Sequence, residues 1–111
     1  MVLLALRRPG TKPVGDVTLA AVTATVVASW FGPGLYGNNL ACGGTLTPAT
    51  NGVAHKSLPC GTRLTVCYLR RCVRTRVVDR GPFVYGRTFD LAAGLARRLR
   101  FSGVHVVRWH L

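Results

Sequence analysis

The chain has 111 residues, 49% of them apolar, which is room for a single domain with one modest core. It carries 15 Lys and Arg residues against three carboxylates, a net charge of +12, and contains no Glu. The carboxylates are Asp16, Asp79 and Asp90. This excludes a carboxylate-rich Ca²⁺ or Mg²⁺ site and leaves Asp79 and Asp90 as the candidates for acid–base chemistry.

The beginning of the chain has the composition of a connecting segment. Gly10, Pro13 and Gly15 are typical of a linker. The apolar stretch 17–28 follows basic residues, as in an export signal, but it is too short for a transmembrane helix and its Val and Thr content favours a strand. We therefore interpret residues 1–27 as a linker, the remnant of a preceding module or an export segment, and residues 28–111 as the domain.

Two segments with alternating polarity predict a β-hairpin. In residues 63–68, Leu64, Val66 and Tyr68 alternate with more polar neighbours, and residues 72–78 alternate in the same way. The four residues between Cys67 and Cys72 are enough for the turn.

A single helix is predicted late in the chain. Asp90 is expected to cap it, Leu91, Leu95 and Leu99 recur every four residues, and Gly103 is expected to end it. Residues 104–109 then predict a closing strand. Many short strands with one helix near the C-terminus are typical of a small, closed or nearly closed β-barrel.

The cysteines indicate disulfides rather than a metal site. Four Cys in a short chain is an even number, and the predicted hairpin brings Cys67 opposite Cys72, which leaves Cys42 to pair with Cys60. A zinc site is the alternative, but the spacing lacks the two-residue knuckle typical of zinc ligands. Disulfides favour an oxidising location, outside the cell or in a bacterial envelope.

The net charge attracts polyanions. Nucleic acid, anionic lipid and acidic wall polymers are candidate partners, and solubility alone is the other interpretation. We expect no specific nucleic-acid partner, because the sequence has no recognised binding motif for nucleic acid. Its cysteines, which are of the disulfide type, also count against such a partner.

Five segments, in order along the chain, resemble the RlpA-like (rare lipoprotein A) double-psi β-barrel family, whose barrel is shared with expansins and family-45 endoglucanases. The segments are residues 28–34, 41–43, 52–62, 78–83 and 89–91, and the strongest are A-H-K-S-L-P-C-G-T and D-R-G-P-F. The resemblance covers about residues 28–109. It implies a mainly-β fold, a six-stranded double-psi barrel with one short helix, and a secreted or cell-envelope location. The RlpA-like enzymes are lytic transglycosylases of peptidoglycan.

The resemblance also implies the site. His55 and Asp79 match two functional positions of the family, while the third, usually Glu, is Gly44 here. Asp90 matches the Asp of the F-D motif in expansins and the endoglucanases. We expect Asp79 to be the catalytic acid and base, assisted by His55 and Asp90. The alternative role for Asp79 is to brace a turn, and that for His55 is a core histidine.

The remaining expectations concern the substrate. Trp30 and Tyr36 are predicted to stack on sugar rings, and Arg80 to contact a substrate anion through its planar fork. We expect a monomer with no cofactor and no metal that binds cell-wall glycan. The missing Glu favours the alternative function, a non-catalytic, expansin-like module that binds or loosens wall polysaccharide.

Overall fold

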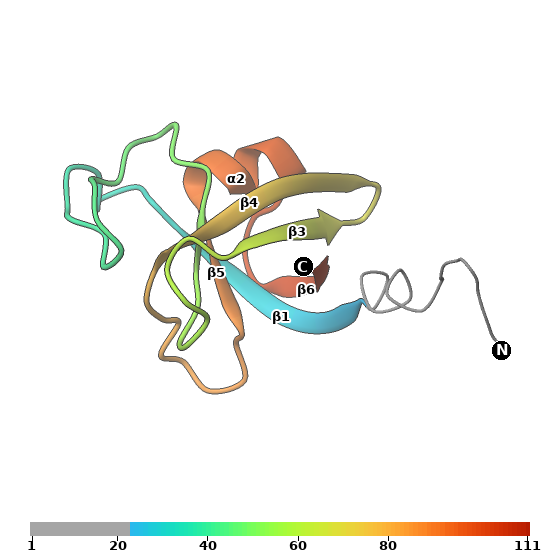
Figure 1. The fold of residues 1–111 in the computed structure, drawn as a ribbon. Helices are drawn as coiled ribbons and strands as arrows, with labels where there is room; N and C mark the ends of the chain where they lie inside the picture. Colours follow the sequence, from blue (N-terminus) through green and yellow to red (C-terminus); the bar gives the residue numbers. More distant parts are fainter. Residues whose placement is uncertain (1–22) are drawn as a thin grey trace, which may run out of the picture.

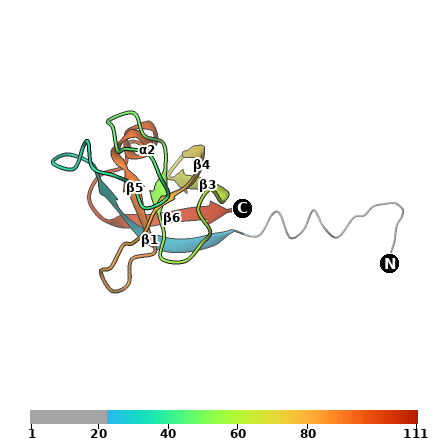
Figure 2. The ribbon, with the colours of Figure 1, turned by 60° about the vertical axis from the view of Figure 1, so that its left-hand side comes forward.

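The computed structural model describes residues 23–111, which form a closed, six-stranded double-psi β-barrel with one short helix (Figures 1 and 2). The elements are β1 (Ala24–Phe31), β2 (Val53–Ala54), β3 (Arg63–Tyr68), β4 (Arg71–Asp79), β5 (Phe89–Ala92), α2 (Ala93–Leu99) and β6 (His105–His110). Around the barrel the strands follow the order β1-β5-β2-β4-β3-β6. The β1–β5 and β2–β4 pairs are parallel and the others are antiparallel. The predicted fold is thereby confirmed.

The first strand extends further toward the N-terminus than the expected domain boundary. β1 begins at Ala24 and pairs with β6 from Ala24, opposite Trp109, to Ala28, opposite His105. The barrel therefore includes residues that were assigned to the preceding segment. The rest of that segment, residues 1–22, lies outside the described residues.

The hairpin of β3 and β4 forms as its alternating sequence predicts. Cys67 lies directly opposite Cys72, and the two form a disulfide with their Cα atoms 4.0 Å apart. Cys42 and Cys60 form the second disulfide, with a Cα separation of 5.5 Å. All four sulfur atoms are therefore engaged in disulfides rather than in the zinc site considered as the alternative.

The core fills the barrel and the space under α2. It is built from fully buried aliphatic side chains and Phe89: Val53, Leu64, Val66, Val77, Phe89, Leu91, Leu95, Leu99 and Val107. Gly94 of α2 lets the loop between β1 and β2 approach the helix closely, because a Cβ at this position would lie 2.4 Å from the carbonyl oxygen of Thr50. Arg97 of α2 also donates to the carbonyl of Pro48. These two contacts fix residues 48–50 against the helix.

The predicted start of the helix is wrong. Asp90 and Leu91 lie in β5, and α2 begins at Ala93 after Ala92, which makes no side-chain capping bond. The helix ends at Leu99, with Arg100 in the left-handed conformation, rather than near Gly103. Asp90 pairs with β1 on one side and with β2 on the other. The backbone N–H and C=O groups of this segment are therefore paired within the sheet and not within a helix.

Candidate active site

Four residues from four adjacent strands form one row across the barrel, which we name the carboxylate row: Ser29, Asp90, Ala54 and Asp79. In the strand register Ser29 is opposite Asp90, Asp90 is opposite Ala54, and Ala54 is opposite Asp79. Side chains of directly opposed residues share a face of a sheet. The two acidic residues are two strand spacings apart, roughly 10 Å between Cα atoms.

A register shift in β4 gives Asp79 its place in the row. Val53 is opposite Val77, whereas the next residue, Ala54, is opposite Asp79, so β4 contains one extra residue, Val78, at this point. Val53 and Val77 belong to the core. Because side chains alternate along a strand, Ala54 and Asp79 face away from that core.

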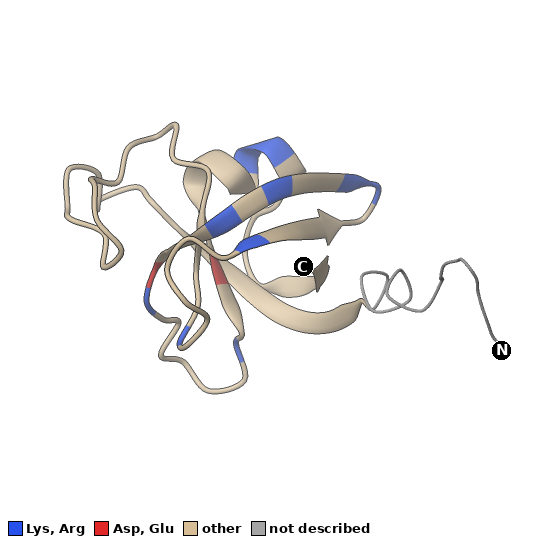
Figure 3. Ribbon diagram, viewed as in Figure 1, with Lys and Arg blue, Asp and Glu red and all other residues tan. Residues whose placement is uncertain are grey.

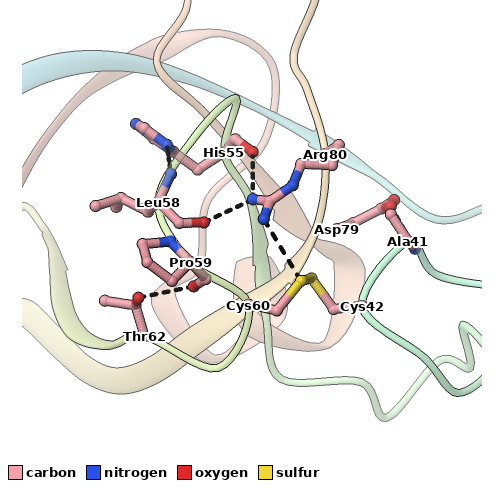
Figure 4. Close-up of a disulfide and its surroundings, with 9 residues drawn as sticks. All are labelled: Ala41, Cys42, His55, Leu58, Pro59, Cys60, Thr62, Asp79 and Arg80. Carbon is pink, nitrogen blue, oxygen red and sulfur yellow. Dashed lines mark hydrogen bonds between the residues drawn. A yellow bond between two sulfur atoms is a disulfide. The ribbon is translucent and has the colours of Figure 1, made fainter.

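The loop containing Ala41 holds the Asp79 carboxylate. The Ala41 N–H donates to Asp79 Oδ1 at 2.9 Å, and the next N–H, of Cys42, donates to the carbonyl of Val78 at 3.1 Å. The Cys42–Cys60 disulfide attaches the same loop to the barrel (Figure 4). Among the described residues Asp79 Oδ2 makes no hydrogen bond, so one carboxylate oxygen is anchored and the other is available for chemistry.

Asp90 is oriented in a similar way. Ser29 Oγ, on the neighbouring strand, donates to Asp90 Oδ1 at 2.6 Å, and the Ser29 side chain is buried. The sequence analysis did not single out Ser29. The available signal was a hydroxyl inside the apolar run 26–31, since a buried hydroxyl requires a partner.

His55 follows β2, but its imidazole lies apart from the row. Its side chain and that of Asp79 point in opposite directions (Figure 4), and its ring packs on Phe89 with centroids 5.2 Å apart. Nδ1 accepts the N–H groups of Ser57 at 3.1 Å and Leu58 at 2.9 Å. The neutral ring therefore carries its proton on Nε2.

Burial lowers the pKa of His55 below its usual value of 6.5, and the positive charges of Arg80 and Lys56 lower it further. The imidazole is consequently neutral at neutral pH. In this state Nδ1 stays an acceptor for the two backbone N–H groups that shape the turn at residues 55–58.

Arg80 holds the loop after β2. Its Nη1 donates to the carbonyls of His55 at 3.2 Å and Leu58 at 2.6 Å, and its Nη2 donates to Cys60 Sγ at 3.5 Å. The guanidinium is directed toward this loop while the adjacent Asp79 carboxyl is directed toward Ala41 (Figure 4).

The predicted sugar-stacking residues are partly exposed, and Trp30 does not face the row. Trp30 and Tyr36 are each 38% exposed. Trp30 follows Ser29 in β1, so it lies on the opposite face of the strand. The loop between β4 and β5 exposes more aromatic surface through Phe83 and Tyr85, and Tyr85 did not attract attention in the sequence.

Gly44, which the resemblance matches to the family's Glu, lies in a tight turn. The N–H of Leu40 donates to the carbonyl of Gly44, and the N–H of Gly43 donates to that of Leu40. Gly44 has φ of +80°, a conformation that other residues adopt only with strain, and a Cβ there would meet no atom within 4 Å. The backbone conformation of this turn therefore favours glycine, although the surrounding space would admit a side chain.

Comparison with known proteins decides the family. The family described as lytic transglycolase matches residues 23–109 of the chain. The chain belongs to this family of RlpA-like double-psi β-barrels. It is 44% identical over 105 residues to a probable endolytic peptidoglycan transglycosylase RlpA of Synechocystis sp., covering 87% of this chain and 32% of that protein. It is 44% identical over 97 residues to the endolytic peptidoglycan transglycosylase RlpA of Campylobacter jejuni, covering 82% and 35%. The chain thus spans about a third of the length of these relatives.

The family's fold also occurs in more distant proteins. The barrel resembles the structure of the Streptomyces papain inhibitor with a TM-score of 0.61 and 18% identity, over 82% of this chain and 94% of that one. At this identity the likeness concerns the fold alone. Within residues 23–111, no three His, Cys, Asp or Glu side chains are grouped as a metal site would require. No helix in the same range has the length and apolar character needed to span a membrane.

Proposed function

We propose that this domain cleaves the glycan strands of peptidoglycan by lytic transglycosylation, with Asp79 as the acid and base. The observation that carries the proposal is the placement of Asp79, with Oδ1 fixed by the Ala41 N–H and Oδ2 left without a partner among the described residues. Membership of the lytic transglycolase family and the names of the 44% identical relatives support the substrate class.

The reaction needs one carboxyl group acting twice. Protonated Asp79 donates its proton to the glycosidic oxygen as the bond from that oxygen to the anomeric carbon breaks. The resulting carboxylate then accepts the proton of the 6-hydroxyl of the muramic residue while that oxygen bonds to the anomeric carbon. The product carries a 1,6-anhydro ring, and Asp79 regains its proton without any water being consumed.

Asp90 is proposed to assist through its charge. The bond-breaking transition state resembles an oxocarbenium ion, which a carboxylate in the same row stabilises. Hydrolysis is the competing outcome, because Asp79 and Asp90 could also act as a pair. Paired carboxyls about 5–5.5 Å apart support retaining hydrolysis, and those about 6.5–9.5 Å apart support inverting hydrolysis.

We assign His55 and Arg80 to positioning rather than to proton transfer. The His55 ring points away from Asp79 and is occupied by two backbone N–H groups, while Arg80 binds the carbonyls of the same loop. Together they keep residues 55–60 in place beside the carboxylate row. This differs from the expected roles of His55 in catalysis and Arg80 in substrate binding.

A non-catalytic, expansin-like module that binds wall polysaccharide is the second candidate. The observation that favours it is Gly44, where the family usually places a Glu. In either function the two disulfides support a secreted or cell-envelope location. We expect the domain to act as a monomer.

The test is incubation of the purified protein with peptide-stripped glycan strands in ¹⁸O-labelled water. We expect 1,6-anhydromuramyl ends without ¹⁸O, detected by mass spectrometry, and a rate at least about 100-fold lower in Asp79→Asn. The Asn side chain still accepts the Ala41 N–H, so the variant is expected to fold normally. Labelled reducing ends would indicate hydrolysis. Wall binding by both proteins with no soluble product would favour the non-catalytic module.

A further inference from the structure

A cleft of about 450 Å³ lies between the outer face of the β3–β4 hairpin and the loop that carries Gly44. Arg63, Arg74 and Arg76 line it from the hairpin, and Gly44, Thr47 and Asn51 line it from the loop. We name it the arginine cleft. Figure 3 shows basic positions along β4 and at the start of β3.

Among residues 23–111 the three arginines of the cleft have no acidic partner. Arg63 and Arg76 are directly opposite each other, and like charges in this arrangement destabilise a sheet. Arg74 donates to Thr65 Oγ1, a neutral partner. Among residues 23–111 the only acidic side chains are Asp79 and Asp90, and neither lines the cleft. An external anion would therefore relieve the repulsion.

The opposite wall of the cleft includes Asn51, whose side-chain oxygen is buried and unpaired. Asn51 Nδ2 donates to the carbonyl of Arg74 at 3.0 Å, which fixes the side-chain amide, while its Oδ1 is buried without a hydrogen-bond partner. A buried acceptor without a donor costs free energy, which a donor reaching it would recover. A ligand that engages the arginine wall carries an anionic group, as an acidic sugar does.

The cleft adjoins the carboxylate row. Arg74 and Arg76 alternate with the buried Thr75 and Val77, and the extra residue in β4 returns Asp79 to the same outer face as the arginines. From Arg76 to Asp79 the chain advances about 10 Å. A short oligosaccharide spans that distance, so one molecule can contact both.

We propose that the arginine cleft binds a carboxylate-bearing sugar residue of the glycan on which Asp79 acts. The inference rests on the proposed function for its substrate. The planar forks of Arg63 and Arg76 suit a carboxylate, which accepts two parallel N–H bonds from each fork. The cleft thus holds the acidic strand in register with the row.

The test measures binding of peptide-stripped glycan fragments with free muramic carboxylates to the Asp79→Asn protein, so that no cleavage occurs. The same fragments with the carboxylates converted to amides are the matched ligand. We expect Arg76→Gln and Arg63→Gln each to weaken binding of the acidic fragment about tenfold and to leave the amidated fragment unaffected. Arg70→Gln, in the turn between β3 and β4, makes the same charge change away from the cleft and is expected to alter neither.

Three results would overturn the proposal. One is an equal effect of Arg70→Gln, which would mean unspecific attraction. Another is equal affinity for the acidic and amidated fragments. The third is binding of inorganic phosphate or a single-stranded oligonucleotide at Arg63 and Arg76 that is stronger than binding of the acidic glycan fragment. The NMR signals of the two guanidinium groups measure this binding. Binding is measured without turnover, so a negative cleavage assay does not affect the result of the binding assay. A negative binding assay likewise does not affect the result of the cleavage assay.

Discussion

Asp79 and Asp90 lie on either side of Ala54 in one row of the barrel, although β4, β2 and β5 are separated in the chain. Each carboxylate has one oxygen fixed by a different element, the Ala41 N–H for Asp79 and the Ser29 hydroxyl for Asp90. The pair is therefore both aligned by the sheet and oriented by its neighbours, as the proposed catalytic role requires.

Ser29→Ala is expected to lower the free energy of unfolding by about 1 kcal/mol, because a hydrogen bond to a half-buried carboxylate is lost. Chemical denaturation measures this. Asp90→Asn is the matched variant, since its amide oxygen still accepts the Ser29 hydroxyl while the charge is removed. We expect Asp90→Asn to reduce cleavage more than stability. Equal losses of stability in both variants would contradict this account of the pair.

His55→Asn is expected to remove a pH-dependent component of stability. The Asn Oδ1 can accept the N–H groups of Ser57 and Leu58, but it does not titrate. The pKa of His55 is lowered in the folded state, so its contribution is complete above about pH 6.5 and is lost as the pH falls through the folded-state pKa. The difference in unfolding free energy between wild type and variant should therefore decrease in acid.

Urea unfolding of both proteins from pH 4 to 8 measures this difference. Because the two proteins differ only at position 55, a change in their difference with pH reports on His55. A difference that stays constant across this range, or an NMR titration that places the His55 pKa above 6.5, would show that the imidazole is not held neutral.

Gly44→Glu is expected to restore a carboxylate at the family position at a cost in stability. A side chain at φ of +80° costs about 1–2 kcal/mol in the left-handed region, and the space around the position is open. Gly44→Ala carries the same backbone cost without the charge. If the missing Glu limits turnover, the Glu variant should release more anhydromuramyl product than the Ala variant. Equal activities would show that Gly44 is not the limiting difference.

Arg80→Lys is expected to destabilise the loop after β2 while preserving charge. A single ammonium cannot replace the fork that contacts the carbonyls of His55 and Leu58. We expect a loss of about 1–2 kcal/mol in unfolding free energy and faster hydrogen exchange at the amides of Ser57 and Leu58. Unchanged exchange together with weaker glycan binding would instead favour the original prediction that Arg80 contacts the substrate.

The hairpin was predictable because its signals are local. Alternation in β3 and β4 and the four residues between Cys67 and Cys72 act over a short range, and the structure reproduces both. The helix signal at Asp90 was also local but failed, because pairing of β5 with two neighbouring strands outweighs the capping preference. Ser29 and the arginine cleft escaped notice because their significance depends on residues distant in the chain.

By itself the sequence determined the scarcity of carboxylates, the disulfide-rich β-barrel and the family motifs, since composition and short-range pattern record these directly. Only the tertiary structure decided that Asp79 and Asp90 share a row, that the His55 ring faces elsewhere and that Arg80 holds a loop. The physical reason is register. Which side chains meet across strands depends on backbone hydrogen bonds between distant segments, and one extra residue in β4 is enough to change the face on which Asp79 lies.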